Sequence, residues 1–359
     1  MDFLTQVTLG GAVGQATMHR EIGSKAVLWG MLAGAIPDLD FIAYPLMDNV
    51  TELTWHRGIS HSILLTVVLT PLLGWVISRA HRGNVTVEKA AVFSFLALGS
   101  HILVDLLTTY PTMILEPFSN MQAAWHVLFI IDPLFTLPLL IFLLLSLLPG
   151  EVRAKQFRNA AGMILAGAYV VVALLFKFSA TTDFERALEQ QDIPVKRMIT
   201  TATPFNTLLW RGIAETEGGY WIGYRSLFDQ GDRIPFWFVP RNEMLLAGIE
   251  DQRAVRTLKW FTNGWYNVVR TPEGELYFRD LRFGDFDTAE PANSFGLGNP
   301  RDLAFTFTFH LIPTGAATGP DQLTLERDFP MPDIQESLSV LWKRIKGVNT
   351  VRPLIPAQQ

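Results

Sequence analysis

The sequence predicts an α-helical integral membrane domain of five to six transmembrane helices, followed by a soluble α+β domain. Charge divides the chain: residues 1–178 carry 21 Lys, Arg, Asp and Glu side chains, whereas residues 179–359 carry 42. Long apolar runs occur only in the first part, and short β-rich runs with turn signals occur only in the second. We therefore predict a transmembrane domain at 1–178, a soluble domain at 183–347 and a tail at 348–359.

Composition excludes several classes of protein. Only 18% of residues are charged, below the roughly 25% of soluble domains, and 49% are hydrophobic, which argues against a disordered chain or a coiled coil. The net charge of −5 offers no broad basic surface, so no nucleic-acid partner is expected. The chain has no Cys, which removes disulfides, thiolate metal sites and Cys nucleophiles.

Six apolar runs are candidates for membrane spans, because each approaches the roughly 20 residues that a bilayer core requires. In chain order they cover residues 3–18, 26–43, 62–78, 90–104, 127–148 and 160–176. The first run is rich in Gly, Thr and Ala and is the weakest, so five spans and a short dipping helix form the alternative. No basic segment followed by a cleavage site opens the sequence, and we do not expect a signal peptide.

Basic residues in the connecting loops predict the orientation. If each run crosses once, one side of the membrane receives eight Lys and Arg residues and the other side receives two. The eight are Arg20, Lys25, Arg79, Arg82, Lys89, Arg153, Lys155 and Arg158, and the two are Arg57 and Lys177. By the positive-inside rule the first side is cytoplasmic, so the C-terminal domain is expected outside the cytoplasm.

Ionisable residues recur at one predicted depth in four consecutive runs, near the outer face. In or beside a transmembrane helix such residues are costly and mark a functional site by default. In chain order they are Asp38, Asp40, His56, His61, His101, Asp105 and Asp132. This coincidence predicts a polar site at the outer face of the membrane.

The spacing of these residues suits a metal. His101 and Asp105 are four residues apart, which places them on one helix face. Asp38 and Asp40 follow Pro37, where a helix is expected to break. Imidazole and carboxylate without thiol indicate a divalent metal, with zinc as our first prediction and manganese or iron as alternatives. The candidate ligands are Asp38, Asp40, His56, His61, His101 and Asp105.

Each position also has a simpler interpretation. A single His or Asp can be a hydrogen-bonded packing residue, and Asp132 before Pro133 can begin a helix. Arg57 can be an interfacial anchor rather than a group that holds an anionic headgroup. The histidines outside the clustered motifs are interpreted as structural: His19, His81, His126 and His310.

Six motifs together resemble a family of prokaryotic membrane-bound metal-dependent hydrolases, over about residues 1–148. In chain order they read MDFLTQVTLGGAVGQA, IPDLDFIAY, HRGISHS, GSHILVDLLTTY, PFS and FIIDPLFTLPLL. The resemblance implies a metal-dependent hydrolase in the bacterial inner (plasma) membrane. The order of His and Asp is loosely similar to that of zinc-dependent phospholipase C, which implies a phosphoester or lipid-like substrate and membrane lipid as a partner.

One residue departs from the family pattern. Many members carry a His directly after the Thr of the opening motif, where this sequence has Gln6. Because Gln is a poor transition-metal ligand beside His, we expect Gln6, like Asp132, to support the site from outside the ligand set. If the first run crosses the membrane, Gln6 lies in the same layer as the other site residues, which favours six spans.

Two functional hypotheses follow. In the first, a metal-activated water attacks a phosphoester or lipid-like substrate at the outer membrane face. Asp40, Asp105 or Asp132 then acts as the base, and Arg57 holds an anionic headgroup. In the alternative, a non-enzymatic membrane binding or assembly protein uses a structural metal or a His/Asp hydrogen-bond cluster to tie its helices together. A transporter ranks last, since the third to sixth runs carry no polar residues toward the other side.

The second half of the sequence alternates short β-rich runs with turn signals. The predicted strands cover residues 197–202, 207–214, 219–224, 237–239, 265–270, 275–280 and 305–311. Helices are expected at 181–190, near 251–261 and at 334–345. The aromatic residues are expected mainly in the core: Trp210, Tyr220, Trp221, Tyr224, Phe236, Trp237 and Phe238. This half contains no catalytic motif.

Overall fold

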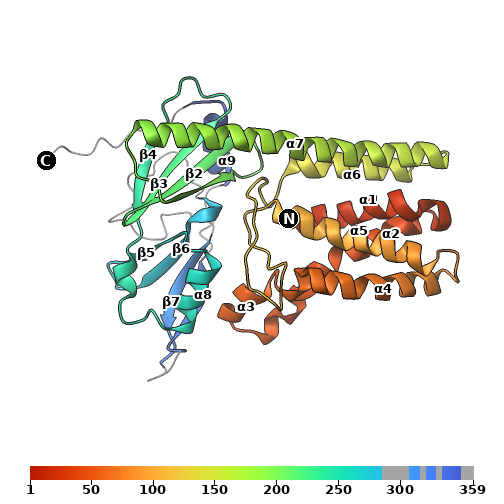
Figure 1. Ribbon diagram of the computed structural model, residues 1–359, viewed down its shortest axis with the longest axis horizontal. Helices are drawn as coiled ribbons and strands as arrows, with labels where there is room; N and C mark the ends of the chain where they lie inside the picture. The colour runs from red at the N-terminus through yellow and green to blue at the C-terminus, as the bar shows by residue number, and fades with distance from the viewer. Residues whose placement is uncertain (285–306, 316–320, 329–333, 349–359) are drawn as a thin grey trace. The chain divides into compact units, whose positions relative to one another are not determined.

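The computed structural model describes residues 1–284, 307–315, 321–328 and 334–348 (Figure 1). The chain forms two compact units, which we call the helical unit and the sheet unit. The helical unit comprises Met1–Met47, Thr54–Leu174 and Pro204–Asn206, and the sheet unit comprises Asp48–Leu53, Leu175–Thr203 and Thr207–Gln359.

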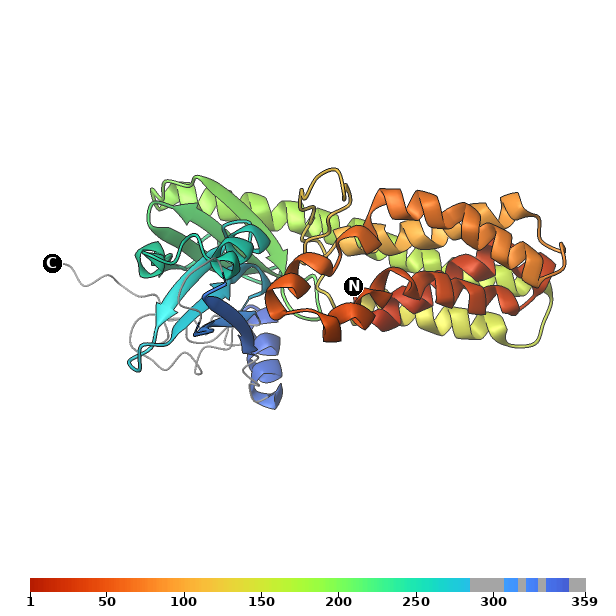
Figure 2. The same cartoon turned by 90° about the horizontal axis from the view of Figure 1, so that it is seen from below.

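Helices in the helical unit lie side by side in both ribbon views (Figure 1 and Figure 2). Their bounds are α1 Phe3–Ile22, α2 Lys25–Ala35, η1 Pro37–Leu46, α3 Asn49–Trp55, η2 Ile59–His61, α4 Ile63–Ala80, α5 Val87–Leu106, α6 Pro133–Leu147 and α7 Val152–Gln190. Side-chain caps fix several starts: Asp2 accepts from the amide of Thr5, and Ser62 accepts from the amide of Leu65. The last residues of α3 and of α7 fall in different units from their first residues.

Glycines let α1 and α2 approach each other closely. A β-carbon built on Gly30 would lie 2.1 Å from the carbonyl oxygen of Gly10, and one on Gly14 would lie 2.0 Å from that of Ala26. Small residues four apart on both helices therefore allow backbone contact, as in other membrane helix pairs. This packing holds α1 against α2, the helix that ends just before the break at Pro37.

The number of apolar helices is smaller than the five to six spans expected from sequence. Among the described residues, α4, α5 and α7 are long and apolar enough to cross a membrane, and α2 with η1 makes a fourth if this pair, bent by 48°, counts as one span. Helix α6 is apolar but has only 15 residues, because Asp132 and Pro133 begin it. Helix α1 has 20 residues but buries polar side chains such as Thr5, Gln6 and Gln15. The sequence runs thus overestimated the spans where polar residues or caps interrupt them.

The sheet unit contains two four-stranded antiparallel sheets, ordered β1-β2-β3-β4 and β5-β6-β7-β8. The strands are β1 Arg197–Ala202, β2 Leu209–Thr216, β3 Gly219–Ser226, β4 Phe236–Pro240, β5 Tyr266–Arg270, β6 Leu276–Asp280, β7 Thr308–Pro313 and β8 Leu323–Asp328. Its shorter helices are η3 Glu243–Leu246, α8 Arg253–Phe261, η4 Leu281–Phe283 and α9 Ile334–Ile345.

Two elements differ from expectation, and two predicted segments lie partly or mostly outside the described residues. Strand β8 was not predicted, and the predicted strand at 305–311 begins outside the described residues. The helix expected at 181–190 is continuous with the last apolar run in α7, since neither Gly nor Pro separates them. Apart from Val348, the predicted tail also lies outside the described residues.

Aromatic side chains dominate the core of the sheet unit, as expected. Trp210, Tyr220, Tyr224 and Trp237 are buried, whereas Phe238 remains 38% exposed. Tyr224 and Trp237 stack with ring centroids 5.5 Å apart, which joins β3 to β4.

Candidate metal centre

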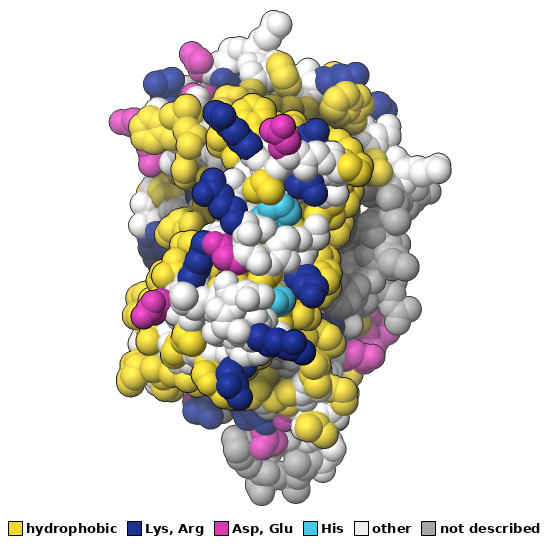
Figure 3. All heavy atoms as spheres, turned by 90° about the vertical axis from the view of Figure 1, so that its right-hand side faces the viewer, with side chains coloured by type: hydrophobic (Ala, Val, Ile, Leu, Met, Phe, Trp, Pro, Cys, Tyr) yellow, Lys and Arg dark blue, Asp and Glu magenta, His cyan; other side chains and the backbone are white. Residues whose placement is uncertain are grey.

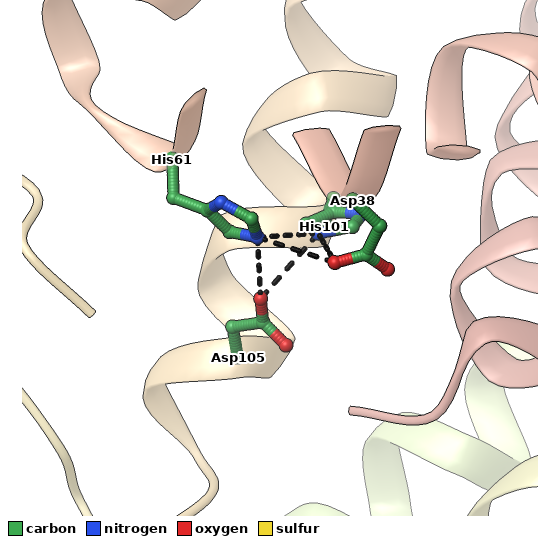
Figure 4. Close-up of side chains that lie close together, drawn as sticks. All are labelled: Asp38, His61, His101 and Asp105. Atoms are coloured by element: carbon green, nitrogen blue, oxygen red, sulfur yellow. Dashed lines mark hydrogen bonds and ion pairs between the residues drawn. The ribbon is translucent and has the colours of Figure 1, made fainter. Parts of the chain in front are cut away.

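Two breaks in the helices and one regular helix carry the site residues. The chain bends by 48° between α2 and η1, where Pro37 opens the 3₁₀ turn that carries Asp38. A second short 3₁₀ turn after Gly58 carries His61, and α5 carries His101 and Asp105 one turn apart. The four side chains point toward one another (Figure 4). His61, His101 and Asp105 are almost fully buried, and the side chain of Asp38 is 15% exposed.

The distances among these four side chains match a single cation. His61 Nε2 lies 3.1 Å from both His101 Nε2 and Asp105 Oδ2. Asp38 Oδ1 lies 3.4 Å from His61 Nε2 and 3.6 Å from His101 Nε2, and His101 Nε2 lies 3.4 Å from Asp105 Oδ2. Tetrahedral zinc with bonds of about 2.0–2.1 Å separates its ligand atoms by about 3.3–3.4 Å. The four residues therefore form a group that can hold a metal ion.

Hydrogen bonds on the other imidazole nitrogens fix where the protons lie. His101 Nδ1 is 2.7 Å from the carbonyl oxygen of Gly34, which can only accept, so Nδ1 carries the proton. The Ser60 hydroxyl donates to Asp40 Oδ2 (2.9 Å), so its oxygen accepts from His61 Nδ1 (2.8 Å). Each neutral ring then turns a lone pair at Nε2 toward the centre.

The centre consequently gathers acceptors without a donor between them. Two imidazole lone pairs and two carboxylate oxygens converge, and the buried Asp105 Oδ2 has no hydrogen-bond partner among the described residues. Such a cluster is repulsive unless a cation lies between the atoms or one imidazole takes a second proton. The donor set thus fits a divalent metal, and ligand type alone leaves zinc, manganese and iron open.

The other oxygen of Asp105 is held by donors. Asp105 Oδ1 lies 2.8 Å from Arg57 Nη2, accepts a 2.9 Å bond from Gln6 Nε2 and pairs with the amino group of Met1. Arg57 is 3% exposed and also donates to the Thr108 hydroxyl. These contacts orient the carboxylate so that Oδ2 faces the centre. The supporting role expected for Gln6 stays a prediction.

Asp40 and His56 lie beside the four-residue group and pair with each other. His56 Nδ1 is 3.2 Å from both carboxylate oxygens of Asp40, and the rings of His56 and His61 are 6.0 Å apart. The side chain of His56 is 26% exposed, more than any of the four converging residues. Burial holds the pKa of His56 below its usual value, although the carboxylate of Asp40 favours the protonated ring. Neither residue contributes an atom to the converging group, so their prediction as direct ligands stays a prediction.

Asp132 caps a helix. Its carboxylate accepts from the amides of Leu134 and Phe135 and from the hydroxyl of Tyr169. No contact between Asp132 and the four-residue group is found among the described residues. This geometry agrees with the simpler interpretation, and its prediction as a catalytic base or supporting residue stays a prediction.

Sequence reasoning did not identify the groups that fix the protons. Ser60 lies within HRGISHS, and the carbonyl of Gly34 belongs to helix α2. The hydroxyl next to a motif histidine was the available signal for Ser60. A backbone carbonyl leaves no signal in the residue pattern.

Comparison with known proteins places this centre within a matched region. The family described as YdjM inner membrane protein matches residues 1–182. A protein of Bacillus subtilis (strain 168), named uncharacterized protein YfhP, is 23% identical over 302 residues, which cover 79% of this chain and 87% of the relative. No solved structure gives a significant match. The matched region spans half of the chain, includes its apolar helices apart from the end of α7 and contains all four converging residues, and the chain belongs to the YdjM inner membrane protein family.

Proposed function

We propose that this membrane protein is a metal-dependent hydrolase that cleaves a phosphoester or lipid-like substrate at the outer face of the inner membrane. The observation that carries the proposal is the Asp40–His56 pair, in which Asp40 is buried and the side chain of His56 is 26% exposed, beside a group of four convergent ligands. A purely structural cation has no need for a hydrogen-bonded acid–base pair at its exposed side. The resemblance of the His/Asp motifs to metal-dependent hydrolases supports the same function.

Each part of the site has a distinct role in this proposal. Asp38, His61, His101 and Asp105 would hold the cation, zinc or alternatively manganese or iron. When bound, such a cation polarises a phosphoryl or acyl oxygen and acidifies water. Arg57 keeps Asp105 in position through its ion pair, rather than reaching out to a headgroup itself.

The Asp40–His56 pair is the best-placed base. Because Nδ1 of His56 faces the carboxylate of Asp40, Nε2 is left to accept a proton from water and to return it to the leaving group. In the net reaction an oxygen of water bonds to phosphorus, the phosphorus–oxygen ester bond breaks, and the alcohol leaves with a proton. The other two candidates already accept hydrogen bonds. Asp105 accepts from Gln6, and Asp132 accepts from the amide of Leu134 at the start of α6.

The site is expected to face the outside of the cell. Figure 3 looks onto the end of the helical unit that carries the α1–α2, α4–α5 and α6–α7 turns, and Lys and Arg side chains gather there. The positive-inside rule makes this end cytoplasmic and the opposite end, with Asp38 and His56, extracytoplasmic. On this basis we also propose an extracytoplasmic sheet unit.

Hydrolysis by metal-loaded protein in detergent tests the function. We expect wild type to release phosphate from lipid phosphoesters and His56→Ala to lose about 10²–10⁴-fold in kcat while it keeps its metal, because general acid–base catalysis contributes about that much. His310→Ala, which removes a partly exposed imidazole from β7, is the matched control and should behave as wild type. Failure of loaded wild type to cleave phosphoesters or acyl esters of any chain length would remove the hydrolase proposal.

A structural cation is the second candidate function. Four protein ligands are enough to complete a tetrahedral zinc shell, as in structural zinc sites, and this is the observation that favours it. In that case the cation ties η1, η2 and α5 together, metal removal lowers the unfolding temperature, and no ester is cleaved. A catalytic centre instead requires an open coordination position, which spectroscopy of a cobalt-substituted protein can detect as a coordination number above four.

A further inference from the structure

An apolar cavity lies next to the metal centre, within the helical unit. Its volume is 290 Å³, close to the lower end of ligand pockets, which run from about 300 to 1,000 Å³. Side chains of α2, of the bend after it, and of α4 line it, among them Trp29, Leu32, Ala35, Ile36, Leu39 and Leu73. The one polar group of this lining, the indole N–H of Trp29, already donates to His81 Nε2 at 2.8 Å.

A single backbone turn separates the cavity from the metal centre. The amide of Leu39 donates to the carbonyl of Ile36 at 3.1 Å, and in a 3₁₀ turn residues three apart lie on one side. Ile36 and Leu39 therefore line the cavity together. Asp38, between them in sequence, projects from another side of the turn into the converging group (Figure 4). The same turn thus borders an apolar space and supplies a ligand.

The chemistry of this cavity selects an alkyl chain as its occupant. Helix α4 is one of the apolar spans, and α2 with η1 forms the bent one, so the cavity lies among membrane-spanning segments. Leu32 and Leu39 are 58% and 43% exposed, which leaves the cavity accessible from the surface of the bundle. A peptide or sugar would have unpaired polar groups against this lining, at a cost of several kcal/mol each, whereas hydrocarbon has none.

We propose that this cavity binds one acyl chain of a membrane phospholipid whose phosphate lies at the metal centre. The inference rests on the proposed function for the fate of the phosphate, and it names the substrate class as a lipid phosphoester. Binding in this manner holds the scissile bond beside Asp38 through contacts remote from the reaction. Water-soluble phosphoesters lack the chain and would lose this contribution.

Photo-cross-linking of the full chain in nanodiscs tests the proposal. The probe is a phosphatidic acid with a diazirine in its acyl chain, and the matched probe is the diacylglycerol with the same chain. Ala35→Phe narrows the cavity, and Ala160→Phe places the same side chain at an exposed position of α7. Leu73→Trp narrows the cavity from α4 and replaces Ala35→Phe if that variant does not fold.

The cross-linking uses the zinc-loaded His56→Ala protein, which should keep its metal without consuming the probe. In this protein we expect cross-links at Trp29, Leu39 and Leu73 to form with the phosphatidic acid about tenfold more than with the diacylglycerol. Narrowing the cavity should lower these cross-links about tenfold, Ala160→Phe should leave them unchanged, and His61→Ala should bring the two probes to the same yield. Equal yields from both probes in the His56→Ala protein, or cross-links that Ala35→Phe and Leu73→Trp leave intact, would overturn the proposal.

Product release by the zinc-loaded wild-type protein, measured in parallel, keeps the two proposals apart. Phosphate-dependent cross-links in the cavity without release of diacylglycerol support lipid binding and remove the hydrolase. Hydrolysis that is equally fast for a water-soluble phosphoester and insensitive to Ala35→Phe keeps the hydrolase and overturns the lipid substrate.

Discussion

The imidazoles of His61 and His101 each use Nδ1 in a hydrogen bond and turn Nε2 toward the same point. Asp105 divides its oxygens in the same way, with Oδ1 held by Arg57 and Gln6 and Oδ2 facing the rings. Supporting contacts of this kind set the tautomer and orientation of metal ligands. Together these contacts leave acceptor atoms facing one another, an arrangement that can hold a metal ion.

The Ser60 hydroxyl gives the first prediction at this scale. Ser60→Ala removes the acceptor for His61 Nδ1 and frees the ring to rotate or change tautomer, so zinc affinity should fall about 10–100-fold. Competition with a chelator measures this affinity. Ser100→Ala is the control, because the hydroxyl of Ser100 lies on α5 and, among the described residues, bonds to the carbonyl of Ala97 alone. Equal affinities of the two variants would show that Ser60 does not position His61.

Asp132 gives the second prediction. As the cap of α6, Asp132→Ala should destabilise the protein by about 0.5–2 kcal/mol and leave the metal content unchanged. Thermal unfolding and elemental analysis of the same preparation measure the two effects. Loss of metal or of hydrolysis in a folded Asp132→Ala protein would instead restore Asp132 to the site.

The converging residues were predictable because their spacings are local. His101 and Asp105 share a helix face because they are four residues apart. Pro37 predicts the helix break after which Asp38 follows. Their supporting contacts were not, since the carbonyl of Gly34 meets His101 only after α2 and α5 have packed. The exclusion of Asp40 and His56 from the converging group likewise depends on their pairing across 16 residues.

At the scale of elements, the close glycine contact between α1 and α2 fixes the position of α2, which leads to the bend at Pro37 and to Asp38. Gly30→Ala places a methyl group against the carbonyl oxygen of Gly10 and should destabilise the protein by about 1–3 kcal/mol, with loss of metal affinity as the bend at Pro37 shifts. Gly167→Ala, on α7, meets nothing within 4 Å and should be neutral. Unfolding temperatures in detergent compare the two, and equal values would contradict the close packing of α1 and α2.

Strand β2 gives a pH-dependent prediction. Burial favours the neutral carboxyl of Glu215, but hydrogen bonds from Arg197 and Arg241 outweigh it and hold its pKa below the ordinary value of 4.5. Such a group adds stability above its unfolded pKa and loses it as the pH falls through the folded pKa. Glu215→Gln should therefore lower the unfolding temperature of the sheet unit at neutral pH, and the difference should shrink as the pH falls below 4.5 and through the lowered pKa of Glu215 in the folded protein.

The control for this experiment is Glu217→Gln. Glu217 has 94% of its side chain exposed, so its ion pair with Lys196 should contribute little at any pH. A deficit of Glu215→Gln that persists unchanged in acid would contradict an ionic origin and point to packing.

Among the elements, strands with alternating residues and the helix at α9 were readable from sequence, because their periodicity is local. The apolar runs predicted the membrane-spanning helices less well. Run length does not reveal that Asp132 and Pro133 shorten α6, nor that α1 turns Thr5 and Gln6 into the bundle. Burial of polar residues against neighbouring helices is a tertiary property, which the runs do not contain.

At the scale of the whole molecule, the uneven density of charge predicted a membrane part and a second part with an ordinary surface. The family and the apolar helices support membrane localisation.

The proposed orientation can be tested with single introduced cysteines, because the chain has no Cys of its own. Asn84→Cys, in the α4–α5 turn, should resist an impermeant maleimide in intact spheroplasts, and Glu217→Cys, in the β2–β3 turn, should react. The reverse pattern would invert the orientation.

Metal content tests the central claim most directly. Elemental analysis of purified wild type, His61→Ala, His101→Ala and the control His310→Ala should show about one divalent metal per chain in wild type and in the control. Both site variants should lose it, because each removes one of four converging ligands. If wild type binds no divalent metal even after reloading, or if both site variants keep it, the cluster is a hydrogen-bonded helix contact and the metal centre is wrong.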